Sequence, residues 1–152
     1  MSGPDQDLVV QANGLTKVYR RAAEAVHALG GVSFEIRRGE FVAITGASGA
    51  GKTTLLNLIG CLDVPTSGQL WLEGREVQQL SERARTYLRR ERLGFVFQHF
   101  GLVPTLTVAE NVALPLLFAG RPADGRITKL LELVSLLHRR HHRPHELSGG
   151  EM

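Results

Sequence analysis

The chain has 152 residues and a net charge of +3 with histidine neutral, and its mean hydropathy is -0.05. This length is enough for one domain with a buried core, and the composition is that of an ordinary globular protein. The amino-terminal residues lack the basic and apolar regions of a signal peptide, and no apolar run approaches the ~18 residues that a membrane span needs. We therefore expect neither a signal peptide nor a membrane-spanning segment. Cys61 is the single cysteine, so we expect a small buried apolar residue and a reducing compartment.

The amino-terminal third predicts a mainly antiparallel β layer. Residues 8–10 and 15–19 have the composition of strands, and Asn13-Gly14 between them is a hairpin signal. Residues 32–37 alternate apolar and polar side chains, which is typical of a strand with one wet face. Arg38-Gly39 then predicts a turn toward the next strand.

Residues 46–53 form the most informative motif of the chain, the complete G-x-x-x-x-G-K-[ST] pattern of a phosphate-binding loop. Its glycines let backbone N–H groups turn inward toward phosphate oxygens. Lys52 would place a positive charge beside the β- and γ-phosphates, and the Thr53 hydroxyl would complete the coordination of a Mg²⁺ ion. The residues expected to contact the nucleotide here are Gly46, Ala47, Ser48, Gly49, Ala50, Gly51, Lys52, Thr53 and Thr54.

The segments that flank the loop have the order that this motif requires. Residues 41–45 are a short apolar run, typical of a fully buried parallel strand. Residues 53–59 are helical in composition, and Gly60 is a suitable carboxyl-terminal stop. Because a strand, the loop and a helix follow one another, we expect the chain to bind a nucleoside triphosphate.

The middle of the chain alternates between predicted strands and a helix. Residues 63–68 predict a loop, and residues 69–72 predict a short strand. Ser81 is a suitable N-cap for a helix that runs to about Arg90. Residues 94–97 then return to a strand that ends at Gln98.

The predicted helix after Ser81 carries the densest cluster of positive charge. Its arginines are interleaved with Glu82 and Glu91, and aromatic residues do not follow them in the pattern that stacks on bases. The segment therefore predicts a solvated helix face or a protein contact, and no nucleic-acid partner is expected. The arginines concerned are Arg83, Arg85, Arg89, Arg90 and Arg92.

The sequence of the last third of the chain predicts helices. Thr107 and Glu110 have the spacing of a capping box, and Pro115 predicts a kink or an early end in the helix that they start. One face of a further helix is apolar and is predicted to pack in a core. That face consists of Ile127, Leu130, Leu131, Val134 and Leu137.

Two short segments lie near the end of the chain. The histidines of residues 138–145 are interrupted by Pro144 and have no cysteine or carboxylate among them, so they predict a solvated basic turn and not a metal site. Residues 147–151 read Leu-Ser-Gly-Gly-Glu, in which Ser148 and Glu151 form a capping-box pattern with accessible glycine N–H groups between them. The pattern fits the start of a capped helix and also fits a second anion site.

Taken with the phosphate loop, residues 147–151 resemble the signature of the ATP-binding-cassette ATPases, and the resemblance covers nearly the whole chain. Tyr19 stands where this family has the aromatic residue that stacks on adenine. Gln98 stands where the family has the Q-loop glutamine that approaches the metal and the attacking water. The resemblance therefore implies that Lys52 and Gln98 are the catalytic candidates. It also implies that Thr53 and Gln98 are the Mg²⁺ ligands. Glu151 replaces the last glutamine of the family's LSGGQ, which adds a charge.

The resemblance implies an α/β fold, that of a P-loop NTPase of the ABC type. An antiparallel β subdomain and the P-loop core, with a central mainly parallel sheet, would occupy about residues 8–97. The Q-loop and a helical subdomain would occupy about residues 98–147, and the signature motif residues 147–152. In the family a second metal-binding aspartate, a catalytic glutamate and a switch histidine follow the signature. We find no counterpart of them, so the carboxyl-terminal part of the core is expected to be missing, and the isolated chain is expected to be unstable and not to hydrolyse ATP.

Softer motifs in residues 60–63, 65–68, 95–98 and 107–115 resemble the macrolide-export and lipoprotein-release branch. The implied function is the energy-coupling ATPase of an exporter, which binds ATP and Mg²⁺, closes against a second nucleotide-binding domain and drives a transmembrane permease from the cytoplasmic face of the membrane. A non-hydrolysing ATP-binding or regulatory module is the alternative.

In the family's closed dimer, the signature of one domain covers the γ-phosphate bound by the other. This role falls on Ser148, Gly149 and Gly150. The loop after Gln98 is where the family docks its permease, so Phe100, Leu102 and Val103 would either contact the permease or pack within the domain.

Overall fold

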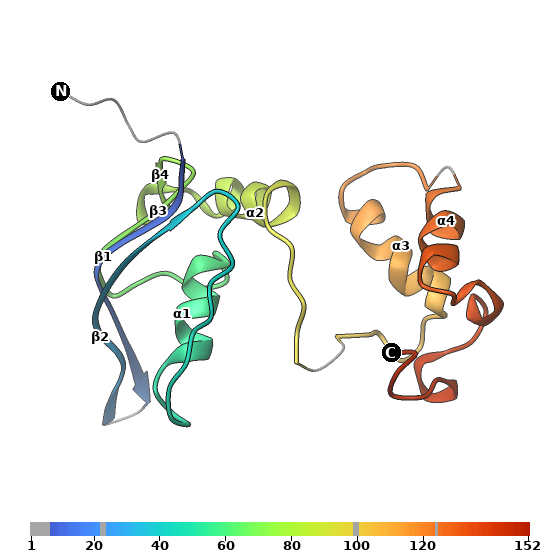
Figure 1. Cartoon of the computed structure of the whole chain (residues 1–152), viewed down its shortest axis with the longest axis horizontal. Helices are drawn as coiled ribbons and strands as arrows, with labels where there is room; N and C mark the ends of the chain where they lie inside the picture. The colour runs from blue at the N-terminus through green and yellow to red at the C-terminus, as the bar shows by residue number, and fades with distance from the viewer. Residues whose placement is uncertain (1–6, 22–23, 99–100, 124) are drawn as a thin grey trace. The chain divides into compact units, whose positions relative to one another are not determined.

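The structure is a computed structural model, and it describes residues 7–21, 24–98, 101–123 and 125–152. The chain divides into two compact units, Met1–Gly94 and Phe95–Met152 (Figure 1). The positions of the two units relative to one another are not determined, so each is described by itself.

The first unit is built on a four-stranded antiparallel sheet with the strand order β2-β1-β3-β4. β1 (Leu8–Arg21) lies between β2 (Glu24–Arg37) and β3 (Ser67–Leu72), and β3 also pairs with the short β4 (Arg75–Glu76). The predicted antiparallel layer is therefore confirmed, and the strand predicted at residues 32–37 is the second half of β2.

The hairpin predicted at Asn13-Gly14 is wrong, because β1 continues through these residues as one strand. The pairing of β1 shifts in register between Ala12 and Leu15, and Gly14 has a φ of 57°. The Gly14 N–H donates to Ser33 Oγ at 2.8 Å, so the irregular position is held by a neighbouring strand. An Asn-Gly pair favours positive φ, and here that preference serves an irregularity within a strand that is paired on both sides.

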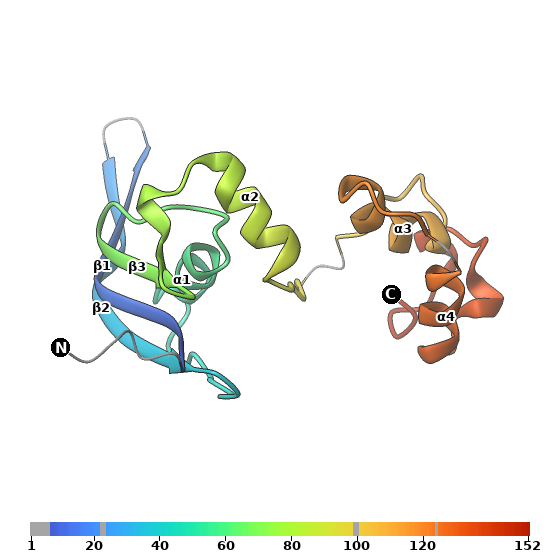
Figure 2. The ribbon, with the colours of Figure 1, turned by 90° about the horizontal axis from the view of Figure 1, so that it is seen from above.

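Two helices pack with this sheet. α1 (Lys52–Ile59) lies against one face of the sheet, with Leu55 and Leu58 buried (Figure 2). After a 3₁₀ turn, η1 (Val77–Gln79), α2 (Glu82–Glu91) begins where Ser81 Oγ accepts the Ala84 N–H at 3.3 Å. Both helices were predicted, and both are confirmed. The core of this unit consists of Val10, Ala12, Leu15, Leu29, Leu55, Leu58, Cys61, Leu70, Leu72, Val77 and Leu88.

The two segments expected to form the central parallel sheet are not strands in the described part of the chain. At residues 41–45, Phe41 is 98% exposed and only Ile44 packs against the core. At residues 94–97, the rings of Phe95 and Phe97 stack at 5.5 Å, while Val96 is fully exposed. A strand needs a hydrogen-bonded neighbour, and no described strand pairs with either segment. The expectation of a buried parallel strand before the loop is therefore wrong for this structure.

The second unit contains two helices that contact each other, α3 (Val108–Phe118) and α4 (Arg126–Leu133). Two 3₁₀ turns follow, η2 (Leu137–Arg139) and η3 (Pro144–Glu146). The capping box of Thr107 and Glu110 is confirmed, and Pro115 lies inside α3, which ends at Phe118. The first N–H groups of α3, those of Val108 and Ala109, donate to the carbonyls of His142 and Arg140 at 2.8 and 3.0 Å.

The predicted apolar face of the last helix is only partly buried. Leu131 is 2% exposed, but Leu130 and Val134 are 40% and 58% exposed. The helix ends at Leu133, and Ser135 has a φ of 59°, so the later members of the face no longer follow a helical repeat. The core prediction is right for Leu131 and wrong for Leu130 and Val134. Over the described residues, the helices fall short of the length and apolarity that a membrane crossing needs.

Candidate functional site

The phosphate-loop residues form a tight turn that leads directly into α1. Gly51 is the N-cap of α1 and has a φ of 83°, a left-handed conformation that favours glycine. A Cβ atom at this position would lie 2.2 Å from the Ala28 carbonyl oxygen and 2.9 Å from Leu29 Cδ2. The loop is therefore seated on β2, and only glycine fits where it makes this contact.

Lys52 folds back over the loop that precedes it. Its ammonium donates to the carbonyl oxygens of Gly46 and Ala47 at 2.9 and 2.8 Å. The positive charge thus lies at the start of the loop, close to the amino terminus of α1, where unpaired N–H groups attract anions. Thr53 is exposed in the first turn of α1. This arrangement suits a phosphate chain, since phosphate oxygens would compete with the two carbonyls for the ammonium.

Tyr19 lies near the same helix, although it comes from β1. Its hydroxyl donates to Asp63 Oδ2 at 2.9 Å, and the Asp63 N–H in turn donates to the Asn57 carbonyl of α1 at 3.3 Å. The Lys17 ammonium lies 4.9 Å from the centroid of the ring. Burial raises the pKa of Tyr19, and the hydrogen bond to Asp63 raises it further. The structure therefore brings Tyr19 together with the helix that follows the phosphate loop.

Asp63 is central to this cluster and was not identified from the sequence. Its Oδ1 atom accepts from the Lys17 ammonium at 2.6 Å and from the Val64 N–H at 2.7 Å. Burial by itself would raise the pKa of Asp63, but the hydrogen bonds from Lys17, Val64 and Tyr19 outweigh burial and lower it. Asp63 lies more than forty residues from Lys17 and Tyr19 in sequence, and no motif links it to them.

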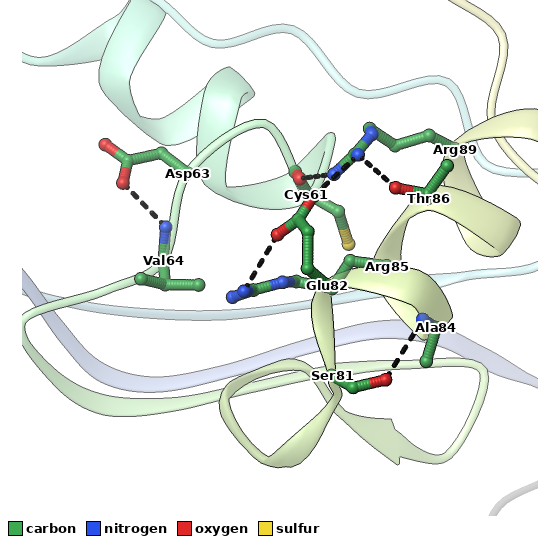
Figure 3. A network of polar contacts seen from close by, with 9 residues as sticks. All are labelled: Cys61, Asp63, Val64, Ser81, Glu82, Ala84, Arg85, Thr86 and Arg89. Carbon is green, nitrogen blue, oxygen red and sulfur yellow. Dashed lines mark hydrogen bonds and ion pairs between the residues drawn. The ribbon is translucent and has the colours of Figure 1, made fainter.

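The loop that carries Asp63 is fastened to α2. Arg89 Nη1 donates to the Cys61 carbonyl oxygen at 2.7 Å, and Arg89 Nη2 donates to Glu82 at 2.8 Å (Figure 3). Glu82 also pairs with Arg85 at 2.9 Å, so some arginines of the predicted basic face bind carboxylates and backbone within the unit. Cys61 is buried, as predicted, and burial raises the pKa of its thiol.

The predicted Q-loop residues belong to the second unit. Gln98 is exposed, Leu102 is half-buried, and Phe100 lies outside the described residues. Val103 is fixed to α3, because its N–H donates to Asn111 Oδ1 at 2.8 Å while Asn111 Nδ2 donates to its carbonyl at 3.2 Å. Gln98 and the phosphate loop therefore belong to different units, each described by itself.

The predicted signature residues form a compact polar turn, also in the second unit. The Ser148 N–H and hydroxyl both donate to Glu151 Oε2, at 2.9 and 2.8 Å. Glu151 Oε1 accepts from Arg139 Nε at 2.9 Å. The hydrogen bonds from Ser148, with help from Arg139, lower the pKa of Glu151 to about 2. Gly149 and Gly150 are exposed between these residues, so their backbone is accessible.

The histidine-rich segment lies mostly in solvent. His138, His141 and His145 are exposed, while His142 is half-buried and contacts Arg139 at 3.3 Å. Within the ranges that the structure describes, no group of three or more histidines, cysteines or carboxylates could hold a metal ion.

Proteins of one family are similar to this chain over most of its length. The family model described as ABC transporter matches residues 29–152. The lipoprotein-releasing system ATP-binding protein LolD of Pseudomonas fluorescens is 49% identical over 146 residues, which are 94% of this chain and 64% of that protein. The macrolide export ATP-binding/permease protein MacB of Brucella abortus is 44% identical over 146 residues, which are 94% of this chain and 23% of that protein.

Solved structures agree as well. The dimeric structure of MJ0796, a bacterial ABC transporter cassette, superposes with a TM-score of 0.83 at 41% identity, covering 93% of this chain and 64% of that one. A post-hydrolysis state of MJ0796 bound to ADP and Pi gives the same TM-score at 42% identity. The cassette fold is thereby confirmed, although the chain spans less than two thirds of the length of these relatives. By sequence and by fold, the chain belongs to the ABC transporter family.

Proposed function

We propose that this chain is the ATP-binding, energy-coupling part of an ABC-type exporter. The observation that carries the proposal is the joining of two recognition elements on α1. The phosphate loop, closed by the Lys52 ammonium, precedes the helix, and Tyr19 is hydrogen-bonded to Asp63, whose loop is tied to the same helix at Asn57. Residues 46–54 would hold the phosphates of ATP, and Tyr19 would stack on adenine.

The residues present fit a Mg²⁺ ion bound together with the phosphates. Mg²⁺ prefers oxygen ligands, and Thr53 offers an exposed hydroxyl at the start of α1. The Gln98 amide oxygen is proposed as a further ligand from the family resemblance alone. When bound, the ion would neutralise charge on the β- and γ-phosphates. Lys52 would release the loop carbonyls and donate to the same phosphates.

The relatives and the exposed signature turn support two partners, a second cassette and a transmembrane permease. MJ0796 has a dimeric structure, and the name of MacB includes a permease. In a dimer of such cassettes, Ser148, Gly149 and Gly150 would contact the nucleotide held by the second cassette, and closure would drive a transmembrane partner. The protein would then be peripheral at the cytoplasmic face of the membrane. Two of the relatives act in lipoprotein release and macrolide export, which supports an exporter.

Residues 1–152 alone are proposed to bind ATP without turning it over. A catalytic carboxylate of this kind would follow a strand, and Glu73 is the residue of the chain that comes closest to this pattern. It lies in the turn between β3 and β4, and its carboxylate is paired with Arg92 at 3.0 Å and with Arg38 at 3.8 Å. Both oxygens of this carboxylate are thus engaged by guanidinium groups, so Glu73 is poorly placed to hold an attacking water.

The test is MgATP binding by the 152-residue chain, produced as a fusion to a soluble carrier. Lys52→Ala removes the loop ammonium and should weaken binding at least about tenfold, because a charge-assisted contact to phosphate is lost. Lys129→Ala, at an exposed lysine of α4, is the matched control and should leave binding unchanged. Binding that is equal in all three proteins would overturn the ATP site. Phosphate release that depends on Lys52 would overturn the claim of no turnover.

A further inference from the structure

We propose that Asp63 and Lys17 are positioning residues that hold the Tyr19 ring as the base platform of the nucleotide site. The inference rests on the proposed function, in which Tyr19 stacks on adenine. It adds two residues outside the phosphate loop that determine how well the base, as distinct from the phosphates, is bound. Three observations carry it, all within the first unit.

The first observation is that the Tyr19 side chain is held at both ends. Its backbone is fixed in β1, where Tyr19 pairs with Val26 of β2. Its hydroxyl, at the far end of the ring, donates to Asp63 Oδ2 at 2.9 Å. A ring anchored only through Cβ would exchange between rotamers, whereas a second anchor restricts both side-chain torsions. A base that stacks on such a ring does not have to order it first, so less affinity is lost on binding.

The second observation is the position of Lys17. Its ammonium lies 4.9 Å from the centroid of the Tyr19 ring, a cation–π distance, and also contacts Asp63 Oδ1 at 2.6 Å and the Val64 carbonyl at 2.8 Å. One face of the ring is therefore occupied by a cation, and a base must use the opposite face. The Lys17 side chain is 12% exposed, so this ion pair is largely shielded from solvent.

The third observation is that Asp63 itself is firmly held. The N–H groups of Leu62 and Asp63 donate to the Asn57 carbonyl at 2.9 and 3.3 Å, which ties the loop to α1. Arg89 of α2 binds the Cys61 carbonyl from the other side (Figure 3). Since Asp63 accepts from the Tyr19 hydroxyl and is itself tied to α1, the ring and the helix that follows the phosphate loop share one support. The spacing between base and phosphates is thus set by this cluster.

The experiment compares two probes, MgATP and magnesium tripolyphosphate, because tripolyphosphate has the phosphates without the base. Both are titrated against the 152-residue chain, again as a carrier fusion. Asp63→Ala removes the hydroxyl anchor, and we expect its ATP affinity to fall roughly five- to tenfold, given the usual contribution of one aromatic stack. Its tripolyphosphate affinity should change by less than about twofold, since the loop contacts remain.

Three further variants separate positioning from folding. Tyr19→Phe keeps the ring and deletes only the hydroxyl, so it should show the same selective loss as Asp63→Ala with little risk to the fold. Lys17→Met removes the cation and should act in the same direction, whereas Lys17→Arg keeps a cation over the ring and should restore most of the ATP affinity. Glu35→Gln is the matched control, at an exposed carboxylate that accepts from Gln11 on the same sheet.

The outcomes distinguish this inference from the proposed function. Equal losses for both probes would mean a general structural role and would overturn the positioning claim, as would ATP affinity that does not change in Asp63→Ala and Tyr19→Phe. If the wild type binds both probes equally well, Tyr19 is no base platform and the inference fails while the phosphate site stands. If the wild type binds neither probe, the proposed function itself fails.

Discussion

Gly51 is the phosphate-loop residue whose replacement has the clearest expected cost. Gly51→Ala combines a φ of 83° with a Cβ atom 2.2 Å from the Ala28 carbonyl. We expect it to destabilise the first unit by about 2–4 kcal/mol, from left-handed strain and overpacking together. Urea unfolding measures the change.

Gly49 provides the matched control for this prediction. Its φ is 82°, almost that of Gly51, but a Cβ atom there would have nothing within 4 Å. Gly49→Ala should therefore cost only the backbone strain, about 1–2 kcal/mol. Equal costs for the two variants would show that the contact with β2 does not restrict Gly51.

Glu151 should make the signature turn sensitive to acid. Its pKa falls from an ordinary 4.5 to about 2 when folded, because the Ser148 groups and Arg139 favour the carboxylate. A lowered folded pKa contributes stability that is complete above pH 4.5 and is lost as the pH falls toward 2. A carboxyl titration by NMR should give a midpoint near 2, and amide exchange of the turn should accelerate over that window.

Arg139→Gln tests the cause of this shift. Loss of the guanidinium removes one of the groups that stabilise the Glu151 carboxylate, so the NMR midpoint should rise while remaining below 4.5, because the Ser148 hydrogen bonds persist. Arg140→Gln, at the neighbouring exposed arginine, is the control. An identical midpoint in wild type and Arg139→Gln would contradict the ion pair.

Residue roles could be predicted only where a local motif exists. The phosphate loop was identified because its eight residues are contiguous, and the turn at Ser148 because its partners are three apart. Tyr19 was chosen by resemblance to a family, and nothing in its local sequence indicates that Lys17 and Asp63 surround it. Such contacts depend on the pairing of β1 with β3, which places Thr16 beside Ser67 and so brings the 61–64 loop to Tyr19.

At the scale of elements, helices were predicted better than strands, because a helix depends on local interactions and a strand on distant ones. A helix is stabilised by hydrogen bonds and caps within a few residues, and the caps at Ser81 and Thr107 were read correctly. A strand requires a partner that is distant in sequence. Residues 41–45 and 94–97 have strand composition but no described partner, so composition alone gave the wrong structure there.

The start of α3 offers a test at this scale. Thr107 Oγ1 accepts the Glu110 N–H at 3.3 Å, while the Glu110 carboxylate accepts from the Thr107 N–H and hydroxyl at 2.7 and 2.8 Å. Thr107→Ala should destabilise the second unit by about 1 kcal/mol, the usual cost of losing an N-cap. Denaturant unfolding monitored by helical circular dichroism measures it.

Thr128→Ala is the corresponding control, since Thr128 lies within α4 and alanine has the higher helix propensity. It should be neutral or slightly stabilising. If Thr107→Ala were as neutral as Thr128→Ala, the capping box would not contribute to the stability of α3.

At the scale of the whole molecule, exposed apolar side chains dominate the expected solution behaviour. Phe41, Val42, Val96 and Phe97 all lie in segments with strand composition and without a described strand partner. Exposed, unpaired segments of this kind template association with other chains. We therefore predict that the 152-residue chain self-associates at micromolar to millimolar concentrations, as partly exposed folds do.

Substitutions at these positions separate association from instability. Phe41→Gln with Val96→Gln should raise the concentration at which light scattering begins, and should change the free energy of unfolding by less than about 0.5 kcal/mol, because both side chains already lie in solvent. Leu58→Gln, at a fully buried position of α1, should instead lower stability strongly, because a polar group would enter the core. A wild-type chain that remains monomeric at millimolar concentration and melts in one sharp transition would contradict the prediction, and it would mean that the segments at residues 41–45 and 95–97 are covered in solution.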